Sequence, residues 1–313
     1  MGRGNGRSCR RAHALNAPAQ SIRQAAHGVW VPIVFVVLWS TGFVVAKYAS
    51  PHAPPLTFLL WRYSAAVAVL LPVIALTRAP WPRTRAAWLH TAVAGILLQA
   101  TYLGGVWYAI AHGLPAGIAA LVVGTQPLLT AVAAGVIGER ASARQWSGLI
   151  LGFAGVVLVV WDRLTGQGID AAVIAIILLA LAGITAGTLY QKRFGGATDL
   201  RTGAAIQFAA SLVVTAPLAA ALESLHVDLV PAFWGALAWS VIVLSLAAMV
   251  LLLAMIRRGR ATEVASLMYL TPPMTAALAW LIFGERLTAV ALTGIAVTVL
   301  GVALVVERKE SNG

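Results

Sequence analysis

Acidic residues are scarce in this chain, and none lies in the middle of a long apolar segment. The sequence has 10 Asp and Glu against 22 Lys and Arg among 313 residues, and every carboxylate falls between apolar segments or at the end of one. A proton relay inside a membrane normally places a carboxylate at mid-depth. We therefore expect no conventional carboxylate relay, and no carboxylate set for metal or aspartyl chemistry. Coupling through the solute's own charge or through histidine protonation is compatible with this lack.

Motifs for nucleotide binding and hydrolysis are lacking as well. The single cysteine, Cys9, allows no intramolecular disulfide and no thiolate metal site. No P-loop is present, so ATP-driven transport would need a separate ATPase subunit, which we do not expect. Ser and Thr in the apolar segments lack a His/Asp partner set. The sequence thus predicts no enzyme, no cofactor and no metal. The alternative, an integral-membrane enzyme, requires a cluster of reactive side chains facing one cavity.

Long apolar runs dominate what is present. The chain is 60% hydrophobic and 10% charged, whereas soluble proteins carry about 25% charged residues. A membrane helix needs about 20 mostly apolar residues, and the sequence predicts an all-α integral membrane protein with ten transmembrane helices. The ten predicted spans lie near 29–48, 56–77, 87–108, 114–137, 145–161, 170–190, 203–224, 231–256, 261–283 and 288–306.

The basic residues gather on one side of the predicted membrane. With the N-terminus in the cytoplasm, ten crossings return the C-terminus there, and 18 of the 22 Lys and Arg then fall in cytoplasmic segments. This asymmetry is the positive-inside rule. We therefore read the net charge of +12 as a topology signal in contact with the lipid bilayer, and expect no nucleic acid partner.

The second half of the chain repeats the first. Residues 112–160 align with 258–306 at a spacing of 146, which superposes the Gly-Glu-Arg triplets at 138–140 and 284–286 and pairs Pro127 with Pro273. The preceding parts align at a spacing of 145, with Arg62 opposite Gln207. Such self-similarity indicates an internal repeat. Five spans per copy is an odd number, so the second copy is inverted, which is the architecture of a secondary transporter.

The repeat divides the chain into two five-helix units with short tails. We expect a disordered basic cytoplasmic tail over 1–28, the first repeat over 29–161, the second over 170–306 and a cytoplasmic tail over 307–313. Residues 1–27 also have the composition of a transit peptide. A signal peptide is not expected, because the first apolar run is too long and no A-x-A site follows it.

Prolines interrupt two corresponding spans. Pro127 is central in the fourth span, and Pro272 and Pro273 in the ninth. A proline in a helix frees the carbonyl four residues earlier, here those of Val123, Met268 and Tyr269, and in a membrane that carbonyl needs a new partner. Broken helices at matching places point to a midplane binding site, with a simple packing kink as the alternative. The expected lining residues here are Thr125, Gln126, Pro127, Tyr269, Thr271 and Pro273.

Polar and aromatic residues in other spans complete the candidate site. Arg62 lies about two turns into the second span, and a charge inside a membrane is by default a functional hypothesis. It would bind a solute carboxylate or phosphate, or alternatively extend to the interface and hold the fold. The other candidates are Trp39, Gln99, Tyr102, Tyr190 and Gln207.

Several further residues near span ends are expected to be structural. We interpret Lys47 as an interfacial anchor, and each Gly-Glu-Arg triplet as a helix-end cap whose Glu and Arg pair with each other. Aromatic residues gather at membrane interfaces. We expect this location for Trp107, Trp161 and Trp234.

The motifs WSTGFVVAKYA (39–49) and PPLTFLLWR (54–62), followed by two proline-containing spans that each end in GER, resemble those of EamA-type transporters of the drug/metabolite transporter superfamily. The resemblance covers about residues 30–306. It implies a ten-helix inner-membrane carrier that exports amino acids, related small metabolites or toxic organic compounds, working as a monomer or weak homodimer. Arg62 matches the family's motif arginine in the first copy, whereas the second copy has Gln207, so a paired basic site for phosphate is not expected.

The mechanism implied is alternating access about a cavity lined by spans one, three, four, six, eight and nine. The alternative function is import or exchange of an anionic metabolite. A pore or a scaffold is a further alternative, and a continuous water path in one conformation would favour the pore.

Overall fold

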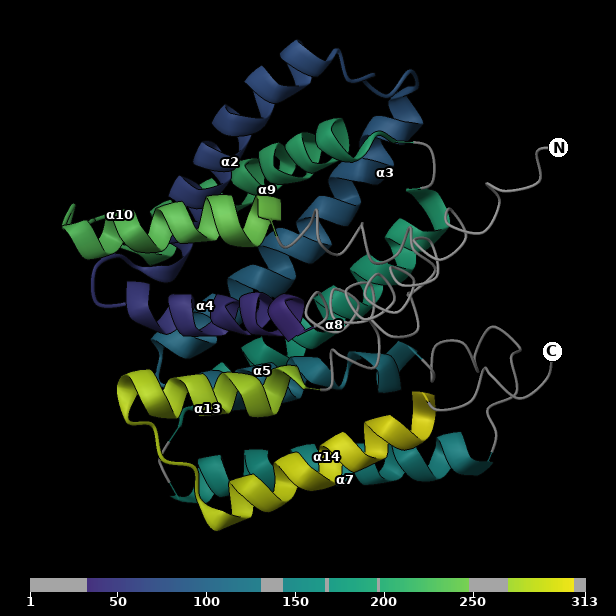
Figure 1. Ribbon diagram of the computed structural model, residues 1–313, viewed down its shortest axis with the longest axis vertical. Helices are drawn as coiled ribbons and strands as arrows, with labels where there is room; N and C mark the ends of the chain where they lie inside the picture. The colour runs from purple at the N-terminus through teal and green to yellow at the C-terminus, as the bar shows by residue number, and fades with distance from the viewer. Residues whose placement is uncertain (1–32, 131–142, 167–168, 196–197, 248–269, 307–313) are drawn as a thin grey trace, which may run out of the picture.

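The computed structural model describes residues 33–130, 143–166, 169–195, 198–247 and 270–306, and every regular element among them is a helix (Figure 1). The all-α prediction is therefore confirmed for these residues. The expected terminal tails at 1–28 and 307–313, the triplet at 138–140 and the candidate Tyr269 lie outside them.

The helices follow the order of the apolar segments. A first helix spans Ile33–Ala49. The rest of the first half holds α2 (Pro55–Thr77), α3 (Arg85–Gly95), η1 (Ile96–Leu103), α4 (Gly104–Ala111), α5 (Ala116–Gly124) and α7 (Ala143–Gly166). The second half holds α8 (Ala171–Phe194), α9 (Leu200–Leu222), α10 (Pro231–Ala238), η2 (Trp239–Ala247), α13 (Thr271–Phe283) and α14 (Ala289–Val306).

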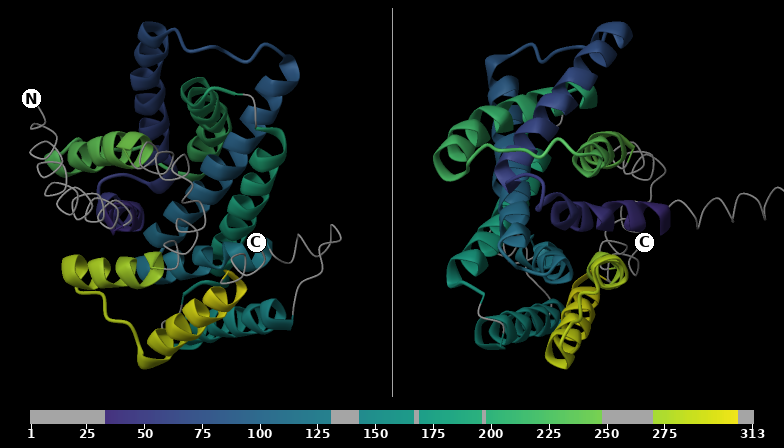
Figure 2. Two further views of the ribbon diagram at one scale, coloured as in Figure 1. Left: turned by 45° about the vertical axis from the view of Figure 1, so that its right-hand side comes forward. Right: turned by 90° about the vertical axis from the view of Figure 1, so that its left-hand side faces the viewer.

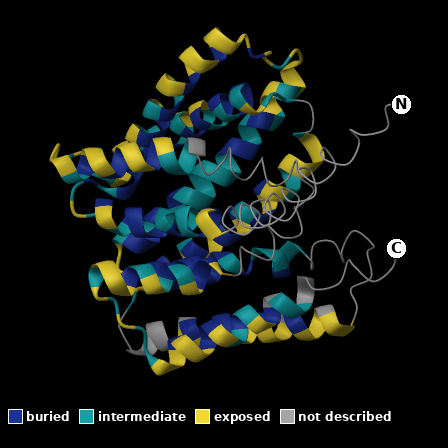
Figure 3. Cartoon of the chain, viewed as in Figure 1, coloured by how far each residue is buried: buried dark blue, intermediate teal, exposed yellow. Residues whose placement is uncertain are grey.

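Four helices are long and apolar enough to cross a membrane. They are α2, the continuous run α3–η1–α4, α8 and α9. Six shorter apolar helices lie within the other predicted spans, namely Ile33–Ala49, Ala116–Thr130, Trp146–Val159, Pro231–Ser245, Thr271–Phe283 and Ala289–Gly301. Many large apolar residues on these helices are exposed. Figure 3 shows exposed residues along α7 and α14. An apolar exterior of this extent is what contact with lipid requires.

Carboxylates mark several helix starts. Asp170 and Asp199 are the N-cap residues of α8 and α9, and each accepts a hydrogen bond from a backbone N–H two residues later, at 2.9 Å. Glu223, at the end of α9, accepts the backbone N–H groups of Leu56 and Thr57 at the start of α2. An acceptor at a helix N-terminus satisfies otherwise unpaired donors. The few acidic residues therefore stay near helix ends for a structural reason.

Helices from the two halves pack against one another. Contacts join α2 to α9, α5 to α13, and α7 to α14, and Figure 2 shows the last pair crossing side by side in both views. Glycines permit this crossing: a Cβ on Gly155 would lie 2.3 Å from Thr298 Oγ1. Close helix approach through small residues is a common way to associate helices in a membrane.

Candidate functional site

A cavity of about 570 Å³ lies between helices of the two halves. Its first-half lining comes from Ile33–Ala49, α2, α3, η1, α4 and Gln126, which follows α5, and its second-half lining from α8, α9, the chain between them and η2. Arg62 and Trp107 are buried at one end, whereas Thr188, Gln191 and Leu200 are exposed at the other. The cavity thus leads from an accessible rim, close to the start of α9, to a buried floor.

Two π-helical segments supply much of the cavity wall. Gln99 and Tyr102 belong to η1, while Leu244 and Ser245 belong to η2. The Ser245 hydroxyl donates to the carbonyl of Ser240, five residues earlier, at 3.0 Å. The Gln99 carbonyl accepts the Tyr63 hydroxyl at 2.8 Å. A π-helical turn alters the register of the side chains that follow it, and such turns occur frequently at functional sites.

Arg62 is the cationic residue of the buried floor. Its side chain leaves α2, the residue is only 6% exposed, and its Nη2 donates to Ser245 Oγ at 3.2 Å. The Nε of Arg62 has no hydrogen-bond partner among the described residues. Arg62 therefore reaches across to the second half of the chain rather than outward to an exposed interface.

Glutamine amides line the walls above this floor. Gln126 Nε2 donates to Thr188 Oγ1 at 3.0 Å, and Gln207 Nε2 donates to Gln191 Oε1 at 3.3 Å. Gln207 is held there by close packing of α9 against α3, where a Cβ on Gly95 would lie 2.5 Å from the Gln207 Cα. These amides offer both donors and acceptors without adding a charge.

Aromatic rings form the apolar part of the lining. Trp39, Phe43, Tyr102 and Trp107 all border the cavity. Trp107 is 2% exposed and stacks on Phe58 at 4.6 Å between ring centroids. Its predicted place in an interfacial belt is wrong, because this end of the α3–η1–α4 run is covered by neighbouring helices. Trp161 and Trp234 are exposed.

Six of the predicted site residues border the cavity. They are Trp39, Arg62, Gln99, Tyr102, Gln126 and Gln207. Five others do not contribute to its described lining: Thr125, Pro127, Tyr190, Thr271 and Pro273. Tyr190 instead bonds His90 Nδ1 through its hydroxyl at 2.7 Å and packs on Phe194.

The proline interruptions differ from the sequence expectation. Helix α5 ends at Gly124, and a new helical stretch begins after Thr125. Backbone N–H groups at this end donate to the carbonyls of Val122 and Val123, so the prediction of a freed Val123 carbonyl is wrong. The physical reason is that the chain tightens to shorter-range bonds at the break. The Thr125 hydroxyl also donates to Val122, at 2.6 Å.

The two adjacent prolines of the second repeat occupy the first turn of a helix. Pro272 and Pro273 follow Thr271, the first residue of α13. A proline there breaks no intrahelical bond, because the first-turn N–H groups have no partner within the helix. Pro273 is exposed and Thr271 is buried away from the described cavity lining. The carbonyls of Met268 and Tyr269 fall outside the described residues.

Sequence reasoning missed several polar residues of the cavity, namely Thr91, Thr188, Gln191, Thr198, Asp199 and Ser245. A single Ser or Thr in an apolar run carries no signal, because its hydroxyl can bond its own helix. Asp199 lies between two apolar segments, as the sequence indicates, and the structure adds that it borders the cavity at the rim. Only the three-dimensional packing of α8 and α9 against α3 and η1, with η2 also bordering the cavity, brings these residues together.

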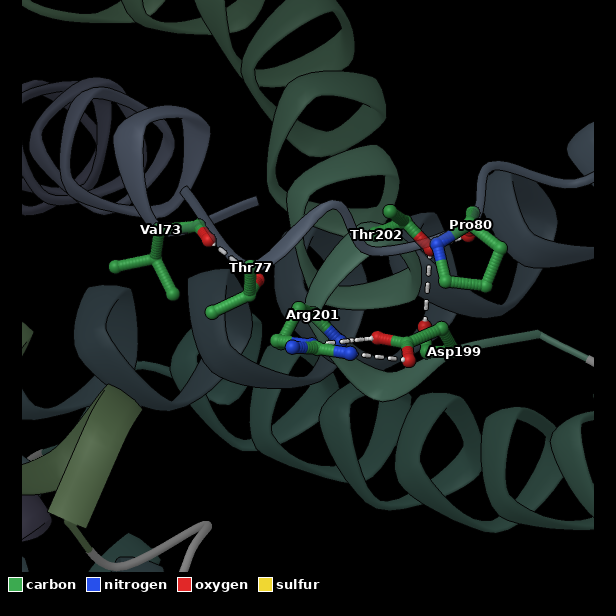
Figure 4. Close-up of polar contacts among 6 residues, drawn as sticks. All are labelled: Val73, Thr77, Pro80, Asp199, Arg201 and Thr202. Carbon is green, nitrogen blue, oxygen red and sulfur yellow. Dashed lines mark hydrogen bonds and ion pairs between the residues drawn. The ribbon is translucent and has the colours of Figure 1, made fainter. Parts of the chain in front are cut away.

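Asp199 forms a local ion pair at this rim (Figure 4). Its carboxylate accepts Arg201 Nη2 at 2.8 Å and Arg201 Nε at 3.0 Å. The Arg201 side chain, with the Arg201 backbone N–H, lowers the pKa of Asp199 to about 2 against the opposing effect of desolvation. Thr202 Oγ1 donates to the Pro80 carbonyl at 3.0 Å, which ties the start of α9 to the chain beyond α2.

The opposite end of the molecule is held by a second set of bonds. Lys47, at the end of helix Ile33–Ala49, forms an ion pair with Glu285, which follows α13. The predicted pairing of Glu285 with its neighbour Arg286 is therefore wrong, since the positive φ of Gly284 turns the chain out of α13 next to Lys47. Asp228 N donates to the carbonyl of His52 at 2.8 Å. Together with the hydrogen bonds that Glu223, at the end of α9, accepts from the start of α2, these contacts join the two halves at the end remote from Asp199.

No group of three His, Cys, Asp or Glu that could hold a metal ion occurs among the described residues. The described lining instead offers the buried cation of Arg62, the paired carboxylate of Asp199 at the rim, neutral amides and hydroxyls, and aromatic faces. Such a set can bind and release an organic molecule through hydrogen bonds and apolar contact.

The family comparison agrees with this arrangement. The family described as the EamA-like transporter family matches residues 27–161 and again residues 171–307. The chain belongs to the EamA-like transporter family. It is a membrane transporter and not an enzyme, as the family and the named relatives are transporters.

Curated relatives of this transporter cover most of its length. The "Uncharacterized inner membrane transporter YedA" of Escherichia coli (strain K12) is 28% identical over 86% of this chain and 87% of its own. The "Uncharacterized transporter YvbV" of Bacillus subtilis is 29% identical over 86% of this chain and 88% of its own. The "Probable amino-acid metabolite efflux pump" of Salmonella typhimurium is 29% identical over 52% of this chain and 53% of its own.

A solved crystal structure shares the fold. It has a TM-score of 0.62 at 19% identity and covers 91% of this chain and 98% of its own. At that identity the likeness concerns the fold alone.

Proposed function

We propose that this transporter exports a small organic solute, an amino acid or a related metabolite, across a bacterial inner membrane by alternating access. The observation that carries the proposal is the cavity of about 570 Å³ lined by both halves of the chain. Cavities of about 300–1,000 Å³ hold small organic ligands. The efflux name of the Salmonella typhimurium relative supports the direction and the solute class.

The proposed architecture is ten membrane helices in two inverted repeats, with both termini cytoplasmic. Three observations support it. The contacting pairs α2/α9 and α7/α14 join corresponding helices of the two sequence repeats, and the contact of α5 with α13 joins the corresponding fourth and ninth spans. The π-helical segments η1 and η2 also fall in corresponding spans. The family match itself occurs twice, once in each half.

The described conformation corresponds to the inward-facing state of this cycle. Lys47–Glu285 and Glu223 hold the halves together at the proposed outer end. The rim with Asp199 faces the proposed cytoplasmic side, where the cavity would take up its solute. Rocking of the halves would break the outer bonds and close the rim. Acting as a monomer is sufficient for this motion, because one chain supplies both sides of the cavity.

The proposal is tested by measuring solute retention in cells that overexpress the protein. Cells are loaded with labelled amino acids, dipeptides or amphipathic amines, and the efflux rate is compared with that of the variant Thr188→Trp. The added indole would occupy the rim, so we expect efflux to fall at least about tenfold at equal membrane content. Leu179→Trp is the matched control, because Leu179 is exposed on the same helix and does not line the cavity.

Unchanged efflux in Thr188→Trp would show that the solute does not pass through this cavity. Faster accumulation rather than faster loss of a solute would instead establish import.

A further inference from the structure

We propose that Arg62 binds a carboxylate group of the transported solute. The inference rests on the proposed function and specifies the solute class that the cavity accepts.

Among the residues that the structure describes, the buried charge of Arg62 has no counter-ion. Guanidinium stays protonated in proteins and carries five N–H donors. The structure gives Arg62 one neutral partner, Ser245, and leaves its buried Nε without one. A buried charge is costly unless it is paired and its donors are satisfied. An anion in the cavity would supply both the charge and the missing acceptor.

Three of the described carboxylates have partners other than Arg62. Glu223 accepts the backbone of α2, Glu285 pairs with Lys47, and Asp199 pairs with Arg201. No described Asp or Glu borders the cavity floor, since Asp199 is the one acidic residue of its described lining and stands at the rim. No described carboxylate therefore neutralises Arg62, and we assign its counter-charge to the solute.

The chemistry of the floor favours a carboxylate over a phosphate. The Nε and Nη2 of one guanidinium form an edge that matches the two oxygens of a carboxylate. A phosphate dianion would need a second cation, but the repeat places the neutral Gln207 opposite Arg62, and Lys47 lies outside the described lining. A single positive charge therefore suits a group with a single negative charge.

The rest of the cavity fits the remaining part of such a solute, whether it is neutral or carries an amino group. The amides of Gln99 and Gln207 and the hydroxyl of Thr188 can bond an amino or amide group, and Trp39 and Trp107 provide apolar contact. Since Arg62 lies on α2 and Ser245 on η2, a carboxylate at this point would contact both halves of the chain. Binding would then be sensitive to how the halves are placed.

The test compares an acid with its amide, which lacks only the carboxylate charge. It also includes an acid without the amino group and inorganic phosphate. Purified full-length protein in detergent is titrated with L-phenylalanine, 3-phenylpropanoate and L-phenylalaninamide, with the corresponding leucine series and with inorganic phosphate, and thermal stabilisation is recorded. We expect acids to bind at least about tenfold more tightly than their amides, as for the loss of a charge-assisted hydrogen bond. Equal binding of acids and amides, or tighter binding of phosphate, would overturn the proposal.

Variants then assign the preference to the residue. Arg62→Gln should abolish the preference for acids, and Arg62→Lys should retain it at reduced affinity. Arg78→Gln is the matched control, because Arg78 is exposed at the end of the same helix. If Arg62→Gln fails to fold, Ser245→Ala decides: it should weaken acid binding several-fold without changing amide binding. Acid preference that survives these substitutions would place the carboxylate elsewhere and contradict the proposal.

This outcome is distinct from failure of the proposed function. Export of a solute without any preference for acids would remove the Arg62 site and leave the transporter intact. Acid binding that depends on Arg62, without export in cells, would retain the site and contradict the proposed direction.

Discussion

Three carboxylates form hydrogen bonds or ion pairs that hold helix ends in place. Glu223 binds the backbone at the start of α2, Glu285 binds Lys47, and Asp199 binds Arg201. None of these acids stands at the buried floor beside Arg62. This separation of the carboxylates from Arg62 has a physical reason. A carboxylate at a helix end stays partly solvated, whereas one beside Arg62 would neutralise the cation that is proposed to bind the solute.

The Asp199–Arg201 pair makes a small, pH-dependent contribution to stability. The pKa of Asp199 is lowered to about 2 from its ordinary 3.8. The ionised carboxylate therefore stabilises the fold above about pH 3.8, and this stabilisation is lost as the pH falls toward 2. The melting temperature of the wild type should exceed that of Asp199→Asn at pH 6, and the gap should narrow at pH 3. A gap that does not change with pH would contradict this assignment, and high salt should reduce the gap because the pair is partly exposed to solvent.

Hydropathy predicts where the helices that line the cavity lie, but it does not predict their local hydrogen-bonding pattern. Apolar run length predicted the helices and their order, and the polar residues Arg62, Gln99 and Gln207 stood out within apolar runs. The π-helical form of η1 and η2 could not be predicted, since it depends on hydrogen-bond partners chosen during packing. Pro127 indicated an interruption of the fourth span, but not that backbone N–H groups at the break would satisfy the Val123 carbonyl. The prediction that Trp107 lies at the membrane interface was wrong for a related reason. Its position near a span end does not reveal which helices cover its side chain.

The approach of α3 to α9 can be tested through Gly95. A Cβ at this position would lie 2.5 Å from the Gln207 Cα, and the Gly95 carbonyl accepts the Ser211 hydroxyl at 3.0 Å. Gly95→Ala should push the helices apart and lower the free energy of unfolding by about 1–3 kcal/mol, with a parallel loss of transport. Thermal unfolding of the purified protein measures the effect.

Gly235→Ala is the control for this helix-to-helix contact, because a Cβ on Gly235 meets nothing within 4 Å. This variant should be neutral or slightly more stable, since alanine favours a helix over glycine. Equal losses in both variants would show that the α3–α9 contact is not the cause.

At the scale of the whole molecule, alternating access requires the bonds at the proposed outer end to open. Glu285→Gln removes the charge that holds Lys47, so we expect the outward-open population to rise. The swap Lys47→Glu with Glu285→Lys should restore the wild-type distribution. Accessibility of a cysteine introduced at Trp39, in a Cys9→Ser background, to an impermeant thiol reagent added outside reports that population. Equal labelling in all three proteins would exclude this pair as a closure of the outer end.

The central claim is that a solute crosses through the cavity by a carrier cycle, and counterflow in proteoliposomes tests it most directly. Purified protein is reconstituted without nucleotide, the vesicles are loaded with an excess of unlabelled solute, and uptake of labelled solute is followed. The account predicts transient accumulation of label by the wild type and by Leu179→Trp, and its loss in Thr188→Trp. Simple equilibration without accumulation would indicate a pore, and accumulation by Thr188→Trp equal to that of the wild type would place the transport path outside this cavity.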